Sequence, residues 1–366
     1  MRHLFLLFVC VLGFVISGCR HSGIPSGSAS HGHLSRSMGD YLRSQDPRGS
    51  DVAPGFGLLG FFYDAPTVVL SLEEAREVYS GARKVLLGTA PEAQVKNAVE
   101  DLIATCRAQL DEACSFVREH FQRPVKLSGP PPGLTREAQE NRVFMSVALR
   151  ARLGTNGQAR DVVVVESAPH GMTEAAIRSL NASKYEPAEM AGHPIEVPYT
   201  FTVRLRWPGQ KLSKEQELAW ARARTSKFPN SPMAWDDLAG LLARDAPEDP
   251  GYAPALARAH ALRPWSWWPA SELAWVRAQE GKYSEAEPLA KVAMREAPEH
   301  PYVLETAALV ASHQGRCSEA VDLQQRAVAK LPAPWPQEEH ARFKQALETY
   351  RGQCPAGAAP SAPVNG

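Results

Sequence analysis

Alternating apolar and polar positions predict a β-hairpin in the middle of the chain. Residues 143–153 carry an apolar side chain at every second position, which is typical of a half-buried strand. Asn156 and Gly157 follow, and both residue types tolerate a positive φ, so we expect a tight turn there. Residues 159–167 then form the returning strand.

A helix and a third strand are predicted after the hairpin. Residues 172–184 have the spacing of a short amphipathic helix that lies across the sheet. Residues 195–207 alternate again, with Val197, Tyr199, Phe201 and Val203 facing inward. The fold class expected here is α+β, a small three-stranded sheet with one packed helix.

Several short strings in this region resemble the C-terminal domain of the TonB family. They are the hairpin at Asn156-Gly157, the helical run Glu174-Ala175-Ala176, Lys184-Tyr185-Glu186-Pro187-Ala188, and Gly192-His193-Pro194-Ile195-Glu196-Val197. The likeness covers residues 130–207, although upstream only Ala138 is kept of the family's usual Tyr-Pro-x-x-Ala string. It carries no catalytic motif.

The resemblance implies recognition of a partner by strand addition, in which an extended segment pairs with a free sheet edge. The candidate edge runs from Ile195 to Arg206, and its candidate residues are Ile195, Val197, Tyr199, Thr200, Phe201, Thr202 and Arg204. The opposite sheet face carries Arg150, Arg152, Arg204 and Arg206. This basic face either meets an acidic partner or is simply solvated, and the sequence leaves both readings open.

A second architecture is predicted after Pro208, where similar residues recur 34 positions apart. The pairs are Gly281 and Gly315, Ala286 and Ala320, Leu289 and Leu323, Ala293 and Ala327, and Pro298 and Pro332. This period resembles the tetratricopeptide (TPR) repeat, an all-α solenoid. We expect about three repeats over 231–332, a leading helix at 213–228 and a capping helix at 336–352, within an array spanning 213–354.

Such arrays present a concave groove to a peptide or a partner helix. Trp265, Trp267 and Trp268 lie within the predicted repeats. They either line this groove or pack between helices.

The N-terminus resembles a bacterial lipoprotein signal peptide. Residues 1–19 contain Arg2, an apolar run of about a dozen residues, and Ser17-Gly18-Cys19. Cys19 is the expected lipid (palmitate) attachment site. An ordinary signal peptide or a short membrane anchor remains the alternative. Residues 20–51 and 355–366 are predicted to be a disordered tether and tail, and His31 and His33 to be solvated rather than a metal site.

Residues 52–129 are predicted to be a helical segment. Ser71 and Glu74 form a capping-box pattern that opens a helix, and two further helices are expected before the Pro130–Gly133 boundary.

Four cysteines remain after the signal segment and Cys19, and an even number in an exported chain favours disulfides. Cys106 and Cys114 can pair if the chain turns between them, since on one continuous helix they would be about 12 Å apart. Cys317 and Cys354 are predicted to join the last repeat to its capping helix. A zinc site lacks the close cysteine or histidine spacing it requires.

The charge balance and the motifs of the sequence limit the classes of function that it predicts. Lys+Arg and Asp+Glu number 40 each, so nothing indicates nucleic-acid binding. The usual hydrolase, phosphate-binding and dinucleotide motifs are missing, so neither an enzyme nor a cofactor nor a metal is predicted.

The favoured hypothesis is a lipid-anchored adaptor on the periplasmic side of the outer membrane. Its expected partners are envelope proteins or extended peptide segments, including those of outer-membrane receptors, with a homodimer through the 195–206 edge left open. The TonB likeness also implies an alternative, an energy transducer for transport, but that role needs a membrane-spanning N-terminal helix and a long proline-rich spacer. An envelope enzyme is the third reading.

Overall fold

The structure is a computed structural model that describes residues 33–45, 59–65, 68–141, 144–205 and 212–353. The predicted signal segment, Cys19, Arg206 and Cys354 lie outside these residues, so what the sequence predicts for them stays a prediction. The helices are α1 (Arg36–Gln45), α2 (Leu72–Leu86), α3 (Glu92–Arg107), α4 (Asp111–His120), α5 (Arg136–Asn141), α6 (Met172–Asn181), α7 (Lys214–Lys227), α8 (Pro232–Asp245), α9 (Tyr252–Leu262), α10 (Trp267–Gln279), α11 (Tyr283–Glu296), α12 (Pro301–His313), α13 (Cys317–Ala329) and α14 (Gln337–Gln353). The strands are β1 (Phe121–Gln122), β2 (Val125–Ser128), β3 (Met145–Leu153), β4 (Ala159–Glu166), β5 (Lys184–Glu186), β6 (Ala188–Met190), β7 (His193–Ile195) and β8 (Val197–Leu205).

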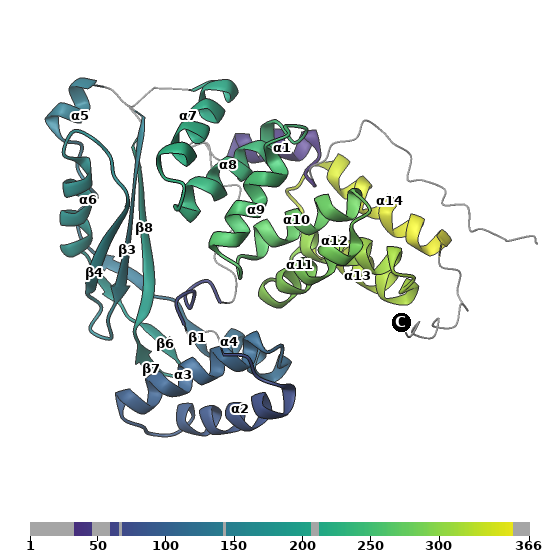
Figure 1. The fold of residues 1–366 in the computed structure, drawn as a ribbon, viewed down its shortest axis with the longest axis horizontal. Coiled ribbons are helices and arrows are strands. Elements are labelled where there is room, and N and C mark those ends of the chain that lie inside the picture. The colour runs from purple at the N-terminus through teal and green to yellow at the C-terminus, as the bar shows by residue number, and fades with distance from the viewer. Residues whose placement is uncertain (1–32, 46–58, 66–67, 142–143, 206–211, 354–366) are drawn as a thin grey trace, which may run out of the picture. The chain divides into compact units, whose positions relative to one another are not determined.

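The main sheet has the strand order β4-β3-β8, all antiparallel, with α6 packed along it (Figure 1). The predicted α+β class, a three-stranded sheet with a packed helix followed by a helical array, is confirmed. The hairpin turns at Asn156-Gly157, where Gly157 has a φ of 72°. A Cβ at Gly157 would lie 1.9 Å from the backbone oxygen of Tyr185. Only glycine fits this turn, because both the dihedral and the close approach exclude a side chain.

Two smaller sheets complete the domain. β1 pairs with β6, which pairs with β7, and β2 pairs with β5. These strands are two to four residues long, too short to show a periodic pattern, and the sequence analysis did not predict β1, β2, β5 or β6. β1 and β2 precede Pro130, so the predicted domain boundary there does not separate two folding units.

One hydrophobic core joins residues 59–117 to the main sheet. It includes Leu59, Leu102 and Val117 from the first region and Leu149 and Val197 from the second, all fully buried. The predicted capping box is present, since Ser71 accepts from the backbone of Glu74 and the Glu74 side chain accepts from Ser71. Residues 52–129 therefore contribute helices, but as part of the same packed body as the sheet.

The chain turns between α3 and α4 at Ala108–Leu110, where Gln109 has a φ of 67°. This turn brings the Cα atoms of Cys106 and Cys114 to 4.7 Å, and their sulfurs form a disulfide. The first predicted disulfide is confirmed. The pairing of Cys317 with Cys354 stays a prediction because Cys354 is outside the described residues.

Helices α7 to α14 form successive antiparallel pairs (Figure 1). Gly281 and Gly315, which are 34 residues apart, both have a positive φ in the turn between the helices of a pair. Alanines at matching positions, including Ala286 and Ala320, are fully buried where the helices touch. The period seen in the sequence therefore records a repeated turn and a repeated helix contact.

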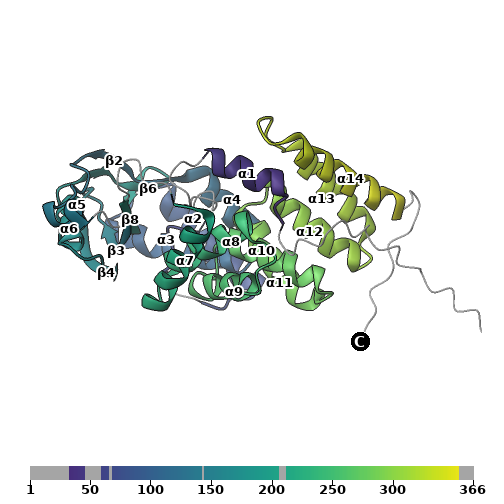
Figure 2. The same ribbon diagram turned by 90° about the horizontal axis from the view of Figure 1, so that it is seen from above.

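The prediction of a disordered tether over 20–51 is wrong for residues 33–45. Residues 36–45 form α1, which packs against α8 and α14 of the array (Figure 2). Leu34 and Met38 are buried in the same core as the array helices. The segment folds because it buries these apolar side chains on the array, a surface that local sequence does not reveal.

Candidate functional site

Strand β8 forms one edge of the main sheet. It pairs with β3 over nine consecutive residues without a register shift, from Met145 opposite Leu205 to Leu153 opposite Val197. Within the described residues no other strand pairs with β8. Its outer backbone groups therefore have the arrangement that an added strand requires.

The predicted edge begins later than expected. Ile195 belongs to β7, where it pairs with Ala188 in a different sheet, and β8 starts at Val197. Val197 is fully buried and Tyr199 and Phe201 are half-buried, which agrees with the predicted inward face. Thr202 is exposed, and Thr200 is partly buried. Burial, together with the neighbouring Tyr185, raises the pKa of Tyr199 well above its usual value, so its hydroxyl stays neutral.

The basic sheet face is not a free cationic surface. Arg152 donates to Glu196 and to Asp64, and Arg204 donates to Asp237 on α8. Burial lowers the pKa of Arg152, but the bonds to Glu196 and Asp64 outweigh it and the pKa is raised. Arg150 is exposed. Two of the predicted basic residues thus meet acids of this chain, an arrangement that sequence alone did not disclose.

The same sheet face is covered near its far end. Ser146 and Ala148 on β3 are buried, although the alternation placed them outward with the arginines. The aromatic ring of Phe144 packs edge-on against Trp220 of α7, with ring centres 4.4 Å apart. The leading helix of the array therefore shields this end of the sheet.

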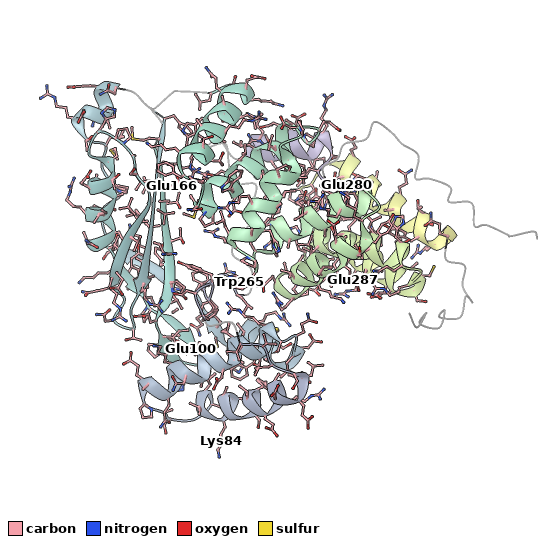
Figure 3. The ribbon with its side chains drawn as sticks, in the orientation of Figure 1. Lys84, Glu100, Glu166, Trp265, Glu280 and Glu287 are labelled. Carbon is pink, nitrogen blue, oxygen red and sulfur yellow. A yellow bond between two sulfur atoms is a disulfide. The ribbon has the colours of Figure 1, made fainter. Side chains whose placement is uncertain are left out.

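A buried ionic network joins the sheet to the array. Glu166, the last residue of β4, accepts two bonds from Arg224 of α7 at 2.6 and 2.9 Å (Figure 3). Arg224 also donates to Asp237 of α8, which in turn accepts from Arg204 of β8. Two carboxylates and two guanidinium groups balance one another there, as buried charges require.

A cavity of about 850 Å³ lies beside the first residues of β8. Ile195, Glu196 and Pro198 form one wall, and apolar side chains of α3 form another: Val95, Val99 and Ile103. Charged side chains of both signs also line it, among them Glu100, Arg152 and Arg160. An extended segment beside β8 would bring one end to this cavity, which can accept an apolar side chain.

The opposite edge, β4, is less regular. Its pairing with β3 shifts register twice, and Asp161 has a φ of 53°. Irregularities of this kind discourage the addition of another strand. Val163 and Val164 of β4 are nevertheless 47% and 42% exposed. This edge is the natural control for any experiment on β8.

Comparison with known families assigns this part of the chain. Residues 130–206 match the family described as the C-terminal domain of the Gram-negative bacterial TonB protein. This region is a TonB C-terminal domain. The match supports a protein-interaction role and agrees with the sheet, hairpin and helix described above.

No curated protein matches the chain. Among solved structures, the chain is similar to a MamA RS-1 ArsTM double mutant, with 16% identity over 39% of this chain and 77% of that one and a TM-score of 0.33. It is also similar to MamA 41-end from Desulfovibrio magneticus RS-1, with 14% identity over 40% of this chain and 89% of that one and a TM-score of 0.29.

A second candidate site lies on the array, outside the TonB C-terminal domain. The ring of His33 is buried between two carboxylates, with Nδ1 3.2 Å from Glu272 of α10 and Nε2 2.8 Å from Glu305 of α12. It stacks on Trp275 with ring centres 3.9 Å apart and meets Tyr302 edge-on. Sequence analysis missed this site, and its prediction of a solvated His33 is wrong.

A weak sequence pattern marks the same segment. Leu34, Met38 and Leu42 are spaced four residues apart, which places them on one helical face. Ser35 accepts from the backbone of Met38 at 3.1 Å and so caps α1. The pattern extends over fewer than three turns and lies among serines, glycines and histidines, which explains why composition suggested a tether.

Trp265, Trp267 and Trp268, the tryptophans singled out in the sequence, serve packing. Trp267 and Trp268 are buried in the array core. Trp265 packs against the core of the TonB C-terminal domain and its preceding helices, with the guanidinium of Arg107 4.1 Å above its ring (Figure 3). The packing reading of these residues is confirmed, and none of them needs to contact a partner.

The described part of the chain contains no group of three metal-ligating side chains that could hold an ion. None of its described helices is both long and apolar enough to cross a membrane.

Proposed function

We propose that this chain is a lipid-anchored adaptor of the cell envelope that binds extended protein segments at the β8 edge. The observation that carries the proposal is the nine-residue unbroken register of β8 with a strand on one side only among the described residues. Backbone hydrogen bonds along such an edge provide affinity, and pockets for alternate side chains provide specificity.

The cavity beside Ile195 and Pro198 supports a preference within this role. A segment that pairs with β8 and ends in an apolar residue would bury that residue against Val95, Val99 and Ile103. The expected partner is therefore an extended segment of an envelope protein with an apolar end, such as that of an outer-membrane receptor.

The anchor and location belong to the same proposal. Cys19 follows Ile16-Ser17-Gly18, a string that supports lipid attachment at this cysteine. Mass spectrometry of the mature N-terminus tests this point, since an intact Met1 would contradict it. The helical array supplies a second protein-binding surface, and we place the whole adaptor at the outer membrane facing the periplasm.

Photo-crosslinking in intact cells tests strand addition. A photoreactive residue replaces Thr202, which is exposed on β8 between Pro198 and Arg204, and the matched control replaces Val163 on the β4 edge. We expect capture of an extended segment of another envelope protein from position 202 and not from 163. Capture from 163 alone, or of only a second copy of this chain from 202, would contradict the proposal.

A further inference from the structure

The pocket around His33 is built from side chains of four array helices. Glu272 of α10 accepts from the hydroxyl of Tyr252 of α9 at 2.7 Å. Glu305 of α12 accepts two bonds from Arg342 of α14 at 2.9 and 2.8 Å. Both carboxylates are thereby held with oxygen atoms directed at the imidazole.

The charges around His33 favour a positively charged imidazole. Glu272, Glu305 and Glu339 contribute three carboxylates, and Arg342 donates to two of them, Glu305 and Glu339. A neutral imidazole has one N–H donor, so it satisfies only one of the two carboxylates that face its nitrogens. A doubly protonated imidazolium donates to both and reduces the excess of negative charge among these groups from two to one.

The rest of the segment fits the array as closely as the ring does. A Cβ on Gly39 would lie 2.5 Å from the backbone oxygen of Arg244 on α8, so α1 approaches α8 more closely than any other residue would permit. Met38 is buried beside it, and Arg43 donates to Asp245 at the end of α8. Contacts along the full length of residues 33–45 thus define one continuous binding surface.

We propose that this surface of the array is a binding site for a peptide that presents a charged imidazole followed by a short helix, that residues 33–45 are its resident ligand, and that a partner with the same features binds by displacing them. The inference rests on the proposed protein-binding role of the array but not on strand addition at β8.

Tethering determines how hard the resident ligand is to displace. A ligand that belongs to the same chain as its site competes at an effective concentration that can be on the order of millimolar. A free peptide with the same sequence must reach about that concentration before it enters the wild-type chain. Any change that releases residues 33–45 raises the fraction of open sites. The apparent dissociation constant of the free peptide should fall in inverse proportion to that fraction.

The test compares the full wild-type chain with an open variant, His33→Ala with Gly39→Ala, in which no array residue is changed. The alanine at 39 favours a free helix by about 1 kcal/mol over glycine, yet it clashes with Arg244 in the docked one. The control is His170→Ala with Gly81→Ala. His170 pairs with the exposed Glu137, and Gly81 has open space around its Cβ position.

Two measurements report on docking. Hydrogen exchange should be at least about tenfold slower in α1 of the wild-type and control chains than in the open variant. A labelled peptide of residues 31–45 should bind the open variant at least about tenfold more tightly than the other two chains. The same peptide with His33→Ala should lose at least about tenfold in affinity for the open variant.

A third measurement needs no variant and keeps the test decisive if the open variant does not fold. Unlabelled peptide at millimolar concentration should accelerate exchange of α1 in the wild-type chain. Equal exchange of α1 in wild-type and open chains, or equal binding of the two peptides, would overturn the inference. None of these results depends on crosslinking at Thr202, so the two proposals fail separately.

Discussion

The β8 edge and the His33 site of the array offer two different kinds of recognition in one chain. The edge presents backbone groups in a regular row, and in the described residues β3 is the strand that pairs with it, on its inner side. The His33 site presents charged and aromatic side chains, and a segment of the same chain already occupies it. A backbone row accepts many sequences, whereas a pocket with two carboxylates on one ring selects a single side chain. An extended partner can therefore bind directly at the edge, whereas a partner of the His33 site must first displace residues 33–45.

The largest effect is expected from a substitution that tests whether the β8 edge and the His33 site belong to one folded body. Arg224→Ala removes the guanidinium that joins Glu166 to Asp237 and leaves both carboxylates buried with fewer partners. Breaking a buried pair in this way costs about 3–5 kcal/mol. Denaturant unfolding of the full chain should therefore show a loss of this order.

Arg222→Ala is the matched control on the same helix. Arg222 pairs with Asp249 at the surface, with 51% of its side chain exposed, and such pairs are worth about 0–1 kcal/mol. If the two substitutions reduce the free energy of unfolding equally, the network does not couple the sheet to the array.

The next substitution should have a smaller effect, confined to the TonB C-terminal domain. Gly157→Ala places a methyl group against the Tyr185 oxygen at a φ of 72°. The positive φ alone costs roughly 1–3 kcal/mol, and the clash adds to it. The hairpin and the TonB C-terminal domain should lose stability. When Gly157→Ala is added to the open variant, binding of the 31–45 peptide to the His33 site should not change.

Gly192→Ala controls for the dihedral, because Gly192 has a φ of 81° but nothing within 4 Å of its Cβ position. It should cost less than Gly157→Ala in the same thermal unfolding experiment. Equal losses would mean that the close approach to Tyr185 contributes nothing.

These glycines also show where sequence reasoning succeeds. The Asn156-Gly157 turn, the alternation of β3 and β8, and the 34-residue period are local patterns, and each predicted its element. The Cys106 pairing followed from geometry once a turn near Ala108 was assumed. Local chemistry therefore specified most of the main sheet and the array.

The failures arise where a segment depends on a distant surface. β1 and β2 are too short to show a period, and they form because β6 and β5 lie beside them. Arg152 and Arg204 alternate as an outer face should, but their carboxylate partners are far away in sequence. His33 lies 239 and 272 residues from the two glutamates that bind it. Local periodicity carries no information about such contacts.

The last prediction concerns pH, because the His33 site contains a histidine whose pKa is raised above its usual value. Burial lowers the pKa of His33, but hydrogen bonds to Glu272 and Glu305 outweigh it, and the net pKa is raised above 6.5. The stabilisation from this group is fully present below pH 6.5 and is lost as the pH rises through the raised value. Burial raises the pKa of Glu305, but Arg342 and His33 outweigh it and the net pKa lies below 4.5. Its contribution is present above pH 4.5 and is lost only at lower pH.

Four other groups near His33 have pKa values that are shifted away from neutrality. Burial and then the charge on His33 lower the pKa of His300 to about 4. Burial first, and then the nearby glutamates, raise the pKa values of Tyr252 and Tyr302 well above 10. The pKa of Arg342 is raised, since Glu305 and Glu339 outweigh the effect of its burial, so Arg342 stays charged.

Binding of the labelled 31–45 peptide to the open variant should therefore be tightest between about pH 4.5 and 6.5, the unperturbed values of the two groups. As the pH rises from 6.5 toward the raised pKa of the bound histidine, binding should weaken by at most about tenfold per pH unit, the limit for one coupled proton, and it should level off above that pKa. A peptide with His33→Gln should bind weakly at every pH in this range, because glutamine cannot take up the proton. Crosslinking from Thr202 should be unchanged over the same interval. Affinity that does not vary with pH would show that His33 has the same pKa in the free and the bound peptide, and affinity that rises with pH would show that the site binds the neutral imidazole; either result would contradict a charged imidazole.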